Sequence, residues 1–408
     1  MLVHWIWLAT RPNVSDRIKQ ELVMRFHDPE DIFYAEAEDY KILPELTDAV
    51  CQSLMDKKLD KAWAVIEACK QKAIHILTYQ DAAYPSRLKN IPDPPMVLYY
   101  KGRLPDFDAQ PFIGVVGTRG ATAYGLTAAK KMGYQIACCG GALVSGAAEG
   151  IDAAAMSGAL TGNGTVVGIL GCGADIVYPA CNKALFADLT RYGCLLTEFV
   201  PGTPPYGWNF PKRNRLISGL SNGVLVVEAP KKSGSLITAE LALEQGRDVF
   251  VIPGNIDSPN SAGSNALLRE GASAVSTGWD MVGEYEELFP GKLRPSEQPG
   301  MAVMSENLEP MVAQTVELPT NKKEKSQAND KKTVDKDQNP PYSGVEKKLP
   351  PLNEQEQRIV NELKQGEKLT DDVIAATRIA AGQMLGILTM LEIKGVISRL
   401  PGNRIALK

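Results

Sequence analysis

The segment from Pro205 to Leu220 combines cationic and aromatic side chains in a way that suits binding of a nucleic-acid strand. Its cations and its aromatic rings are Lys212, Arg213, Arg215, Tyr206, Trp208 and Phe210. No Asp or Glu occurs between Glu198 and Glu228, although the chain has a formal net charge of −4. Cations neutralise phosphates, and aromatic rings stack on bases with about 1–3 kcal/mol per base. A buried Trp–Phe pair under a solvated basic turn is the alternative interpretation.

Three small-residue turns follow apolar runs, and each leads into a helical stretch. In chain order they contain Gly117-Thr118-Arg119, Ser145-Gly146 and Gly234-Ser235. Backbone N–H groups at such a turn, together with the helix dipole, form a site for a phosphate, and Arg119 adds a permanent charge. Each turn taken alone is also compatible with an ordinary tight turn. Asp152, near the second turn, is interpreted as a complement to a helix dipole.

The motifs of nucleotide-dependent enzymes are absent from the sequence. Neither G-x-x-x-x-G-K-[ST] nor a strand-end G-x-G-x-x-G occurs, so we expect no cofactor. The three histidines, His4, His27 and His75, all precede residue 100. The rest of the chain therefore lacks the commonest general base and metal ligand, and we predict no catalytic residue and no metal site.

The elements that position these turns are short apolar runs alternating with helical windows. The runs are Phe112–Val116, Ala142–Ser145, Val166–Leu170, Leu195–Thr197, Val224–Val227 and Val249–Ile252, with Met96–Tyr100 leading into them. Apolar runs without polar alternation are typical of strands buried on both faces. The sequence thus predicts an α/β, Rossmann-like core with a mostly parallel sheet, whose ligands bind at the carboxyl ends of the strands.

Composition and periodicity predict four segments. Residues 1–80 form a small helical domain, 81–290 the core, 291–351 a disordered Pro/Lys/Glu-rich linker, and 352–408 a domain of three helices and a hairpin, the order of a winged helix. The first domain is either a DNA-contacting helical hairpin or, as we favour, a packing or partner-docking module. The third helix of the last domain carries no cation before Lys394, which favours protein contact over sequence-specific DNA reading.

The absence of long apolar runs and the pattern of cysteines predict a cytoplasmic protein. No apolar run of about 18 residues is present, so we expect no membrane segment. Seven cysteines without a C-x-x-C pair indicate buried, reduced thiols.

Several stretches in the same order resemble the DNA-processing protein A (DprA, or Smf) family. They are Val115–Arg119, Ser145–Ala147 with Gly150–Asp152, Leu170–Gly173 with Tyr178-Pro179, Phe210–Gly219, Ser233–Ala239 and Val251–Ile256. The resemblance is strong over residues 80–285 and general at both ends. One departure is Met156, where the family usually has a histidine.

The resemblance implies a single-stranded DNA-binding protein that protects incoming DNA in natural transformation, assists loading of the RecA recombinase and forms a homodimer. By similarity, Arg119, Phe210, Lys212 and Arg215 contact DNA. Together with the turns, the predicted DNA-contacting residues are Gly117, Thr118, Arg119, Ser145, Gly146, Phe210, Lys212, Arg213, Asn214, Arg215, Gly234 and Ser235. We expect phosphates in the turns, a base stacked on Phe210 or Trp208, and the four cations on the DNA backbone.

Two other functions remain open at this point. A phosphoribohydrolase-like enzyme would use a glycine turn followed by Thr and Glu, which Gly234, Thr238 and Glu240 superficially match. An adaptor would use the linker and the winged helix to recruit a partner. The paired glycines of a nucleotide site are missing, and the basic-aromatic segment would have no role in a hydrolase, so we favour DNA binding.

Overall fold

The computed structural model describes residues 2–40, 47–295, 354–364, 366–377, 396–400 and 404–407, together with 379, 384, 387, 388 and 391. The chain divides into two compact units, Met1–Met311 and Val312–Lys408. The predicted linker lies outside the described residues except for 291–295. Within the described part of the chain, no helix has the length and apolar character needed to cross a membrane.

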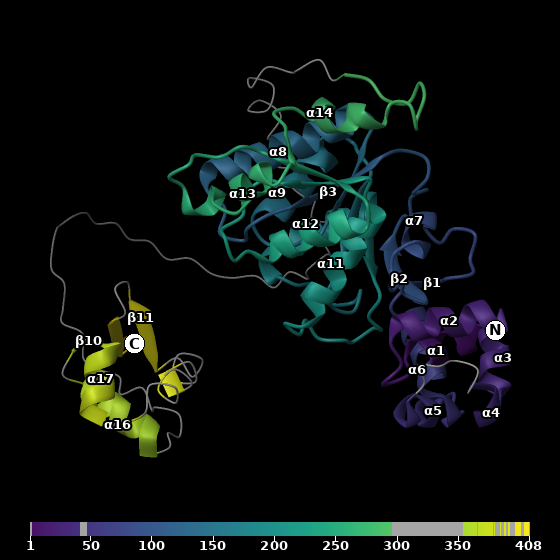
Figure 1. Ribbon diagram of the computed structural model, residues 1–408, viewed down its shortest axis with the longest axis horizontal. Helices are drawn as coiled ribbons and strands as arrows, with labels where there is room; N and C mark the ends of the chain where they lie inside the picture. The colour runs from purple at the N-terminus through teal and green to yellow at the C-terminus, as the bar shows by residue number, and fades with distance from the viewer. Residues whose placement is uncertain are drawn as a thin grey trace, which may run out of the picture. The chain divides into compact units, whose positions relative to one another are not determined.

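The N-terminal part is helical (Figure 1). Its helices are α1 (Leu2–Ala9), α2 (Asp16–Phe26), α3 (Pro29–Tyr34), α4 (Ala37–Tyr40), α5 (Asp48–Met55) and α6 (Asp60–Gln71). The hydroxyl of Ser15 accepts a hydrogen bond from the Ile18 N–H and so caps α2. Asp28 caps α3, whose first residue is Pro29. Trp7, Leu22 and other buried side chains form the core of this part.

The sheet has nine strands in the order β1-β2-β6-β5-β4-β3-β7-β8-β9. The strands are β1 (His75–Thr78), β2 (Val97–Gly102), β3 (Phe112–Val116), β4 (Ala142–Ser145), β5 (Val166–Ile169), β6 (Cys194–Thr197), β7 (Gly223–Val226), β8 (Asp248–Val251) and β9 (Ser273–Ala274). All pairings from β6 to β9 are parallel. Only β1 and β2 are antiparallel to their neighbours, which confirms the predicted mostly parallel sheet.

Helices cover both faces of this sheet, as can be followed in Figure 1. Its helices are α7 (Ser86–Lys89), α8 (Ala123–Cys138), α9 (Ile151–Thr161), α10 (Lys183–Tyr192), α11 (Asn209–Leu220), α12 (Gly234–Glu244), α13 (Ser264–Arg269) and α14 (Trp279–Val282), with 3-10 turns η1 (Ala180–Asn182), η2 (Pro259–Ser261) and η3 (Gly283–Tyr285). Ile113 and Val115 pack with α8, α9 and α10, whereas Phe112 and Val116 pack with α11 and α12. Met156 is fully buried in the first of these clusters.

The order of the strands creates the place for a ligand. β3 lies between β4 and β7, and the chain crosses from β3 through α8 to β4 on one side and from β6 through α11 to β7 on the other. Such a reversal of strand order opens a crevice at the carboxyl ends of the strands. The turns after β3, β4 and β7 therefore surround one region.

The second unit contains α16 (Glu354–Leu363), β10 (Lys368–Leu369), α17 (Thr370–Thr377), β11 (Ile397–Leu400) and β12 (Arg404–Leu407). Its antiparallel sheet has the order β10-β12-β11. The hairpin was predicted, whereas the two-residue β10 adds a strand that the sequence did not indicate. Most of the predicted third helix lies outside the described residues.

Candidate nucleic-acid interface

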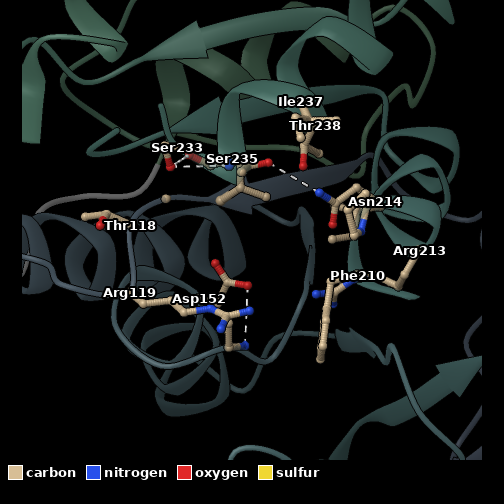
Figure 2. Close-up of a pocket in the computed structure, with 16 residues that line it drawn as sticks. Thr118, Arg119, Asp152, Phe210, Arg213, Asn214, Ser233, Ser235, Ile237 and Thr238 are labelled. Atoms are coloured by element: carbon tan, nitrogen blue, oxygen red, sulfur yellow. Dashed lines mark hydrogen bonds between the residues drawn. The ribbon is translucent and has the colours of Figure 1, made fainter. Parts of the chain in front are cut away.

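A pocket of about 290 Å³ lies at the carboxyl ends of the central strands. Its walls come from the turn after β3, the starts of α9 and α11, and the turn into α12 (Figure 2). The lining includes Gly117, Thr118, Arg119, Asp152, Phe210, Arg213, Asn214, Ser233, Gly234, Ser235 and Thr238. A smaller adjoining hollow shares Arg119, Phe210 and Arg213 and adds Gly146, Glu149 and Tyr178.

Arg119 is the exposed cation of this pocket. Its guanidinium carbon lies 5.5 Å from the centroid of the Phe210 ring, and it lines both the pocket and the adjoining hollow. Within the described residues no carboxylate pairs with it. Gly150 has φ +84°, and a Cβ there would lie 2.5 Å from the Thr118 carbonyl oxygen. Because Gly150 has no side chain, the start of α9 can pack directly against the backbone of Thr118 and Arg119.

Phe210 lies in the first turn of α11 and is half-buried. A Cβ at Gly171 would lie 2.8 Å from its ring, so the absence of a side chain there makes room for the ring. The Tyr178 ring lies 5.5 Å away, a neighbour that sequence reasoning missed although Tyr178-Pro179 belongs to a recognised motif. Trp208 is exposed, so the alternative of a buried Trp–Phe pair is wrong.

Arg213 lies beneath the pocket and is buried. Its Nη1 donates to the Gly146 carbonyl oxygen at 2.7 Å and also to that of Ile169. Burial lowers the pKa of Arg213 to about 10, although Asp152 opposes this effect. The Arg213 guanidinium already donates hydrogen bonds to two carbonyl oxygens at strand ends. Arg213 therefore stabilises the floor of the pocket.

Two of the three predicted phosphate-binding turns are occupied by carboxylates of the chain itself. Glu228 accepts hydrogen bonds from the Thr122 N–H at 2.9 Å and from its hydroxyl at 2.6 Å, at the start of α8. Asp152 accepts the N–H groups of Gly146 at 3.0 Å and Ala148 at 3.4 Å. Burial raises the pKa of Asp152, whereas Arg213 lowers it. The chain's own carboxylates therefore stabilise these two turns. The role of Glu228 was not predicted from the sequence.

The third turn, which leads into α12, differs from the other two because no carboxylate hydrogen-bonds to it in the described part of the chain. The Ser233 hydroxyl accepts from the Ser235 N–H at 3.3 Å and lies 2.7 Å from the Ser235 hydroxyl. A Cβ at Gly234 would meet nothing within 4 Å. Asn214 donates to the Gly234 carbonyl oxygen at 3.3 Å and ties α11 to this turn. The Ser233 N–H donates to the Pro230 carbonyl oxygen at 3.0 Å. Since no carboxylate of the described residues hydrogen-bonds to the turn, the positive end of the α12 dipole can favour an anion in the pocket.

Arg215 and Lys212 belong to an ion-pair cluster that joins α2 to α11. Arg215 pairs with Glu198 at 2.8 Å, Asp93 at 2.8 Å and Asp16 at 3.2 Å, and only 5% of its side chain is exposed. Burial acts to lower its pKa, but these carboxylates outweigh it and raise the pKa. Arg215 does not line the pocket.

Lys212 is the more exposed cation of the cluster. It pairs with Asp16 at 2.9 Å and Glu198 at 3.2 Å, and 46% of its side chain is exposed. Burial acts to lower its pKa, but the two carboxylates raise it. The Lys212 side chain is therefore partly exposed to solvent beside the pocket, although its charge is already paired with two carboxylates.

Two further predicted residues have defined positions. Ser145 is fully buried, and its hydroxyl donates to the Val115 carbonyl oxygen at 2.6 Å, so it holds strands together. Glu240, the acid of the hydrolase alternative, is exposed on α12 and does not line the pocket, whereas Thr238 does. Within the described residues, no group of three or more His, Cys, Asp or Glu side chains is arranged to hold a metal ion.

Comparison with known proteins gives consistent results along the chain. The family model for DNA recombination-mediator protein A matches residues 75–286, and that for the DprA winged helix domain matches 346–403. The chain is 34% identical to Protein Smf of Synechocystis over 359 residues, which is 83% of this chain and 81% of the relative. It is 40% identical to DNA processing protein DprA of Bacillus subtilis over 224 residues, 55% of this chain and 74% of the relative. The X-ray structure of DNA processing protein A from Streptococcus pneumoniae matches with a TM-score of 0.60 and 33% identity, covering 70% of this chain and 98% of that one.

Proposed function

This chain belongs to the DNA recombination-mediator protein A (DprA/Smf) family, and from that premise we propose that it binds single-stranded DNA in the pocket between α11 and α12. The observation that carries the proposal is the exposed guanidinium of Arg119 above the Phe210 ring, opposite the N-terminus of α12. A cation, an aromatic face and a helix N-terminus in one pocket match a phosphate with its adjacent base.

In the proposed complex a backbone phosphate lies between Arg119 and the turn formed by Ser233, Gly234 and Ser235. The helix dipole of α12 favours its charge, and the serine hydroxyls can donate hydrogen bonds to its oxygens. The adjacent base stacks on Phe210. Every base offers a π face, so this arrangement tolerates many sequences.

The other predicted contacts take different roles in this proposal. Arg213 and Arg215 support the pocket and the attachment of α2, since their guanidinium groups are buried and hydrogen-bonded. Lys212 remains a contact at the edge of the pocket, where a phosphate competes with Asp16 and Glu198. The backbone of Gly117, Thr118 and Gly146 shapes the wall.

The family supports a wider role for the chain as a DNA-processing protein. We propose that it acts in natural transformation in the cytoplasm, that it protects incoming DNA and assists loading of the RecA recombinase, and that it works as a homodimer without catalysis of its own. The exposed position of Glu240 outside the pocket weighs against the phosphoribohydrolase alternative. Partner contact by the winged helix remains a prediction.

The test is a fluorescence-anisotropy titration of labelled oligo-dT with wild type, Phe210→Ala and Tyr192→Ala. Tyr192 is an exposed aromatic residue next to the amino end of β5 and serves as the matched control. Loss of one stacked base predicts about 5- to 150-fold weaker binding for Phe210→Ala and no change for Tyr192→Ala. Equal affinities, or release of free base from nucleoside monophosphates that Glu240→Ala abolishes, would contradict the proposal.

A further inference from the structure

A second aromatic surface lies outside the pocket, on the segment that leads into α11. The rings of Tyr206 and Trp208 stack with centroids 4.7 Å apart and planes 12° from parallel. Trp208 is 72% exposed and Tyr206 is 45% exposed. Large aromatic side chains left open to water mark interaction sites more often than isolated surface residues do.

The backbone that carries this pair is fixed by several hydrogen bonds. The Asn209 side-chain amide donates to the carbonyl oxygens of Gly171 at 3.0 Å and Pro204 at 3.3 Å. The Gly202 N–H donates to Asp175 at 2.9 Å, and Asp175 pairs with Lys72 at 2.5 Å. A ligand therefore meets rings on a preformed support and pays little additional ordering entropy.

The pair lies close to the pocket residue Phe210 in the sequence. Trp208 precedes α11 directly and stands two residues before Phe210. Gly171 accepts the Asn209 amide that anchors the pair, and the same glycine makes room for the Phe210 ring. The chain has no acidic residue from 199 to 227, and the charge of Asp175, which accepts the Gly202 N–H, is paired with Lys72.

We propose that Tyr206 and Trp208 form a second base-stacking subsite, which holds a nucleobase of the same strand whose neighbouring nucleotide occupies the pocket at Phe210. This inference rests on the proposed function. A flat base extends an existing parallel stack of rings, and each outer ring face is a platform that any base can use. The occupant is a base and not a protein side chain, because Trp208 stands two residues before Phe210, whose ring lies beneath the cation Arg119 in the proposed DNA pocket.

The subsite predicts a dependence on oligonucleotide length. A strand that fills only the pocket gains nothing from the pair, whereas a longer strand gains one stacked base. Such a base contributes about 1–3 kcal/mol, which corresponds to about 5- to 150-fold in affinity.

The experiment titrates labelled oligo-dT of increasing length, from three nucleotides upward, into full-length wild type, Trp208→Ala, Trp208→Phe and Trp63→Ala. Trp63 is 56% exposed on α6 and provides the matched control. We expect Trp208→Ala to lose about 5-fold or more with long oligonucleotides and nothing with the shortest that binds. Trp208→Phe retains a ring and should regain most of the affinity, and Trp63→Ala should equal wild type. Circular dichroism confirms that each variant is folded.

The outcomes separate this inference from the proposed function. If wild type binds and Phe210→Ala is defective while Trp208→Ala equals Trp63→Ala at every length, the second subsite is wrong and the pocket stands. If wild type binds no oligonucleotide, both are wrong. A change in oligomer mass of Trp208→Ala by light scattering, with DNA affinity unchanged, would assign the pair to protein contact and overturn the inference.

Discussion

Asp16 provides a sharp test of the ion-pair cluster that holds α2 against α11. Its carboxylate lies 3.1 Å from Lys19, 2.9 Å from Lys212 and 3.2 Å from Arg215, and 11% of the side chain is exposed. Burial acts to raise the pKa of Asp16, but the three cations outweigh it and lower the pKa from 3.8 to about 2. Each pKa unit corresponds to about 1.4 kcal/mol. The charged carboxylate thus contributes about 2 kcal/mol to the free energy of unfolding.

Asp16→Asn should remove most of this contribution at neutral pH. A carboxylate whose pKa is lowered by folding stabilises the protein fully above its unfolded pKa and loses this effect as the pH falls through its folded pKa. The difference between wild type and Asp16→Asn should therefore be constant at about 2 kcal/mol above pH 5. It should shrink from about pH 4 downward and approach zero near pH 2.

The assay is urea unfolding followed by tryptophan fluorescence at pH 7, 5, 4 and 3. Asp188→Asn is the matched control, because Asp188 is exposed on α10 and its replacement should change the stability by less than about 0.5 kcal/mol. If Asp16→Asn and Asp188→Asn are equally stable at pH 7, or if the deficit of Asp16→Asn persists unchanged to pH 3, the cluster does not stabilise the fold as argued.

Three further predictions concern the residues around the pocket. Gly171→Ala places a Cβ 2.8 Å from the Phe210 ring. Oligo-dT affinity measured by anisotropy should therefore fall, while thermal stability should change little. An unchanged affinity would contradict the packing role of Gly171. Glu228→Ala removes two hydrogen bonds to Thr122 at the start of α8 and should cost about 2 kcal/mol in urea unfolding, whereas a neutral result would refute its capping role. Arg213→Met leaves two strand-end carbonyls without a donor and should cost about 1–3 kcal/mol. The log–log slope of DNA affinity against salt concentration should be the same for Arg213→Met as for wild type. A shallower slope for the variant would show that the Arg213 guanidinium contacts a phosphate.

The sequence predicted the central strands almost to the residue. β3 and β4 have the bounds predicted for Phe112–Val116 and Ala142–Ser145, because strands buried on both faces appear as uninterrupted apolar runs. β1 and β9 were missed. β1 begins with the exposed His75, and β9 is the pair Ser273-Ala274, so neither carries enough apolar sequence to be distinguished from a loop.

The site was predicted less completely, for reasons of long-range pairing. Gly117, Arg119, Phe210 and Gly234 were singled out from local turns and composition, and the structure brings them into one pocket. The partners of Arg215 could not be predicted, since Asp16 lies 199 residues away in sequence. Glu228 did have a signal, because it is the acid that ends the acid-free segment and lies two residues after the end of β7.

Arg119 is proposed to neutralise a DNA phosphate in the pocket, and the salt dependence of binding distinguishes this role from a purely structural one. Oligo-dT affinity would be measured at several salt concentrations for wild type, Arg119→Ala and Arg103→Ala, where Arg103 is an exposed cation beside the amino end of β5. For single strands the log–log slope is about −0.7 per phosphate neutralised. We predict that Arg119→Ala binds more weakly with a slope shallower by about 0.7, while Arg103→Ala matches wild type. An Arg119→Ala variant with wild-type affinity and slope would show that Arg119 does not contact a DNA phosphate.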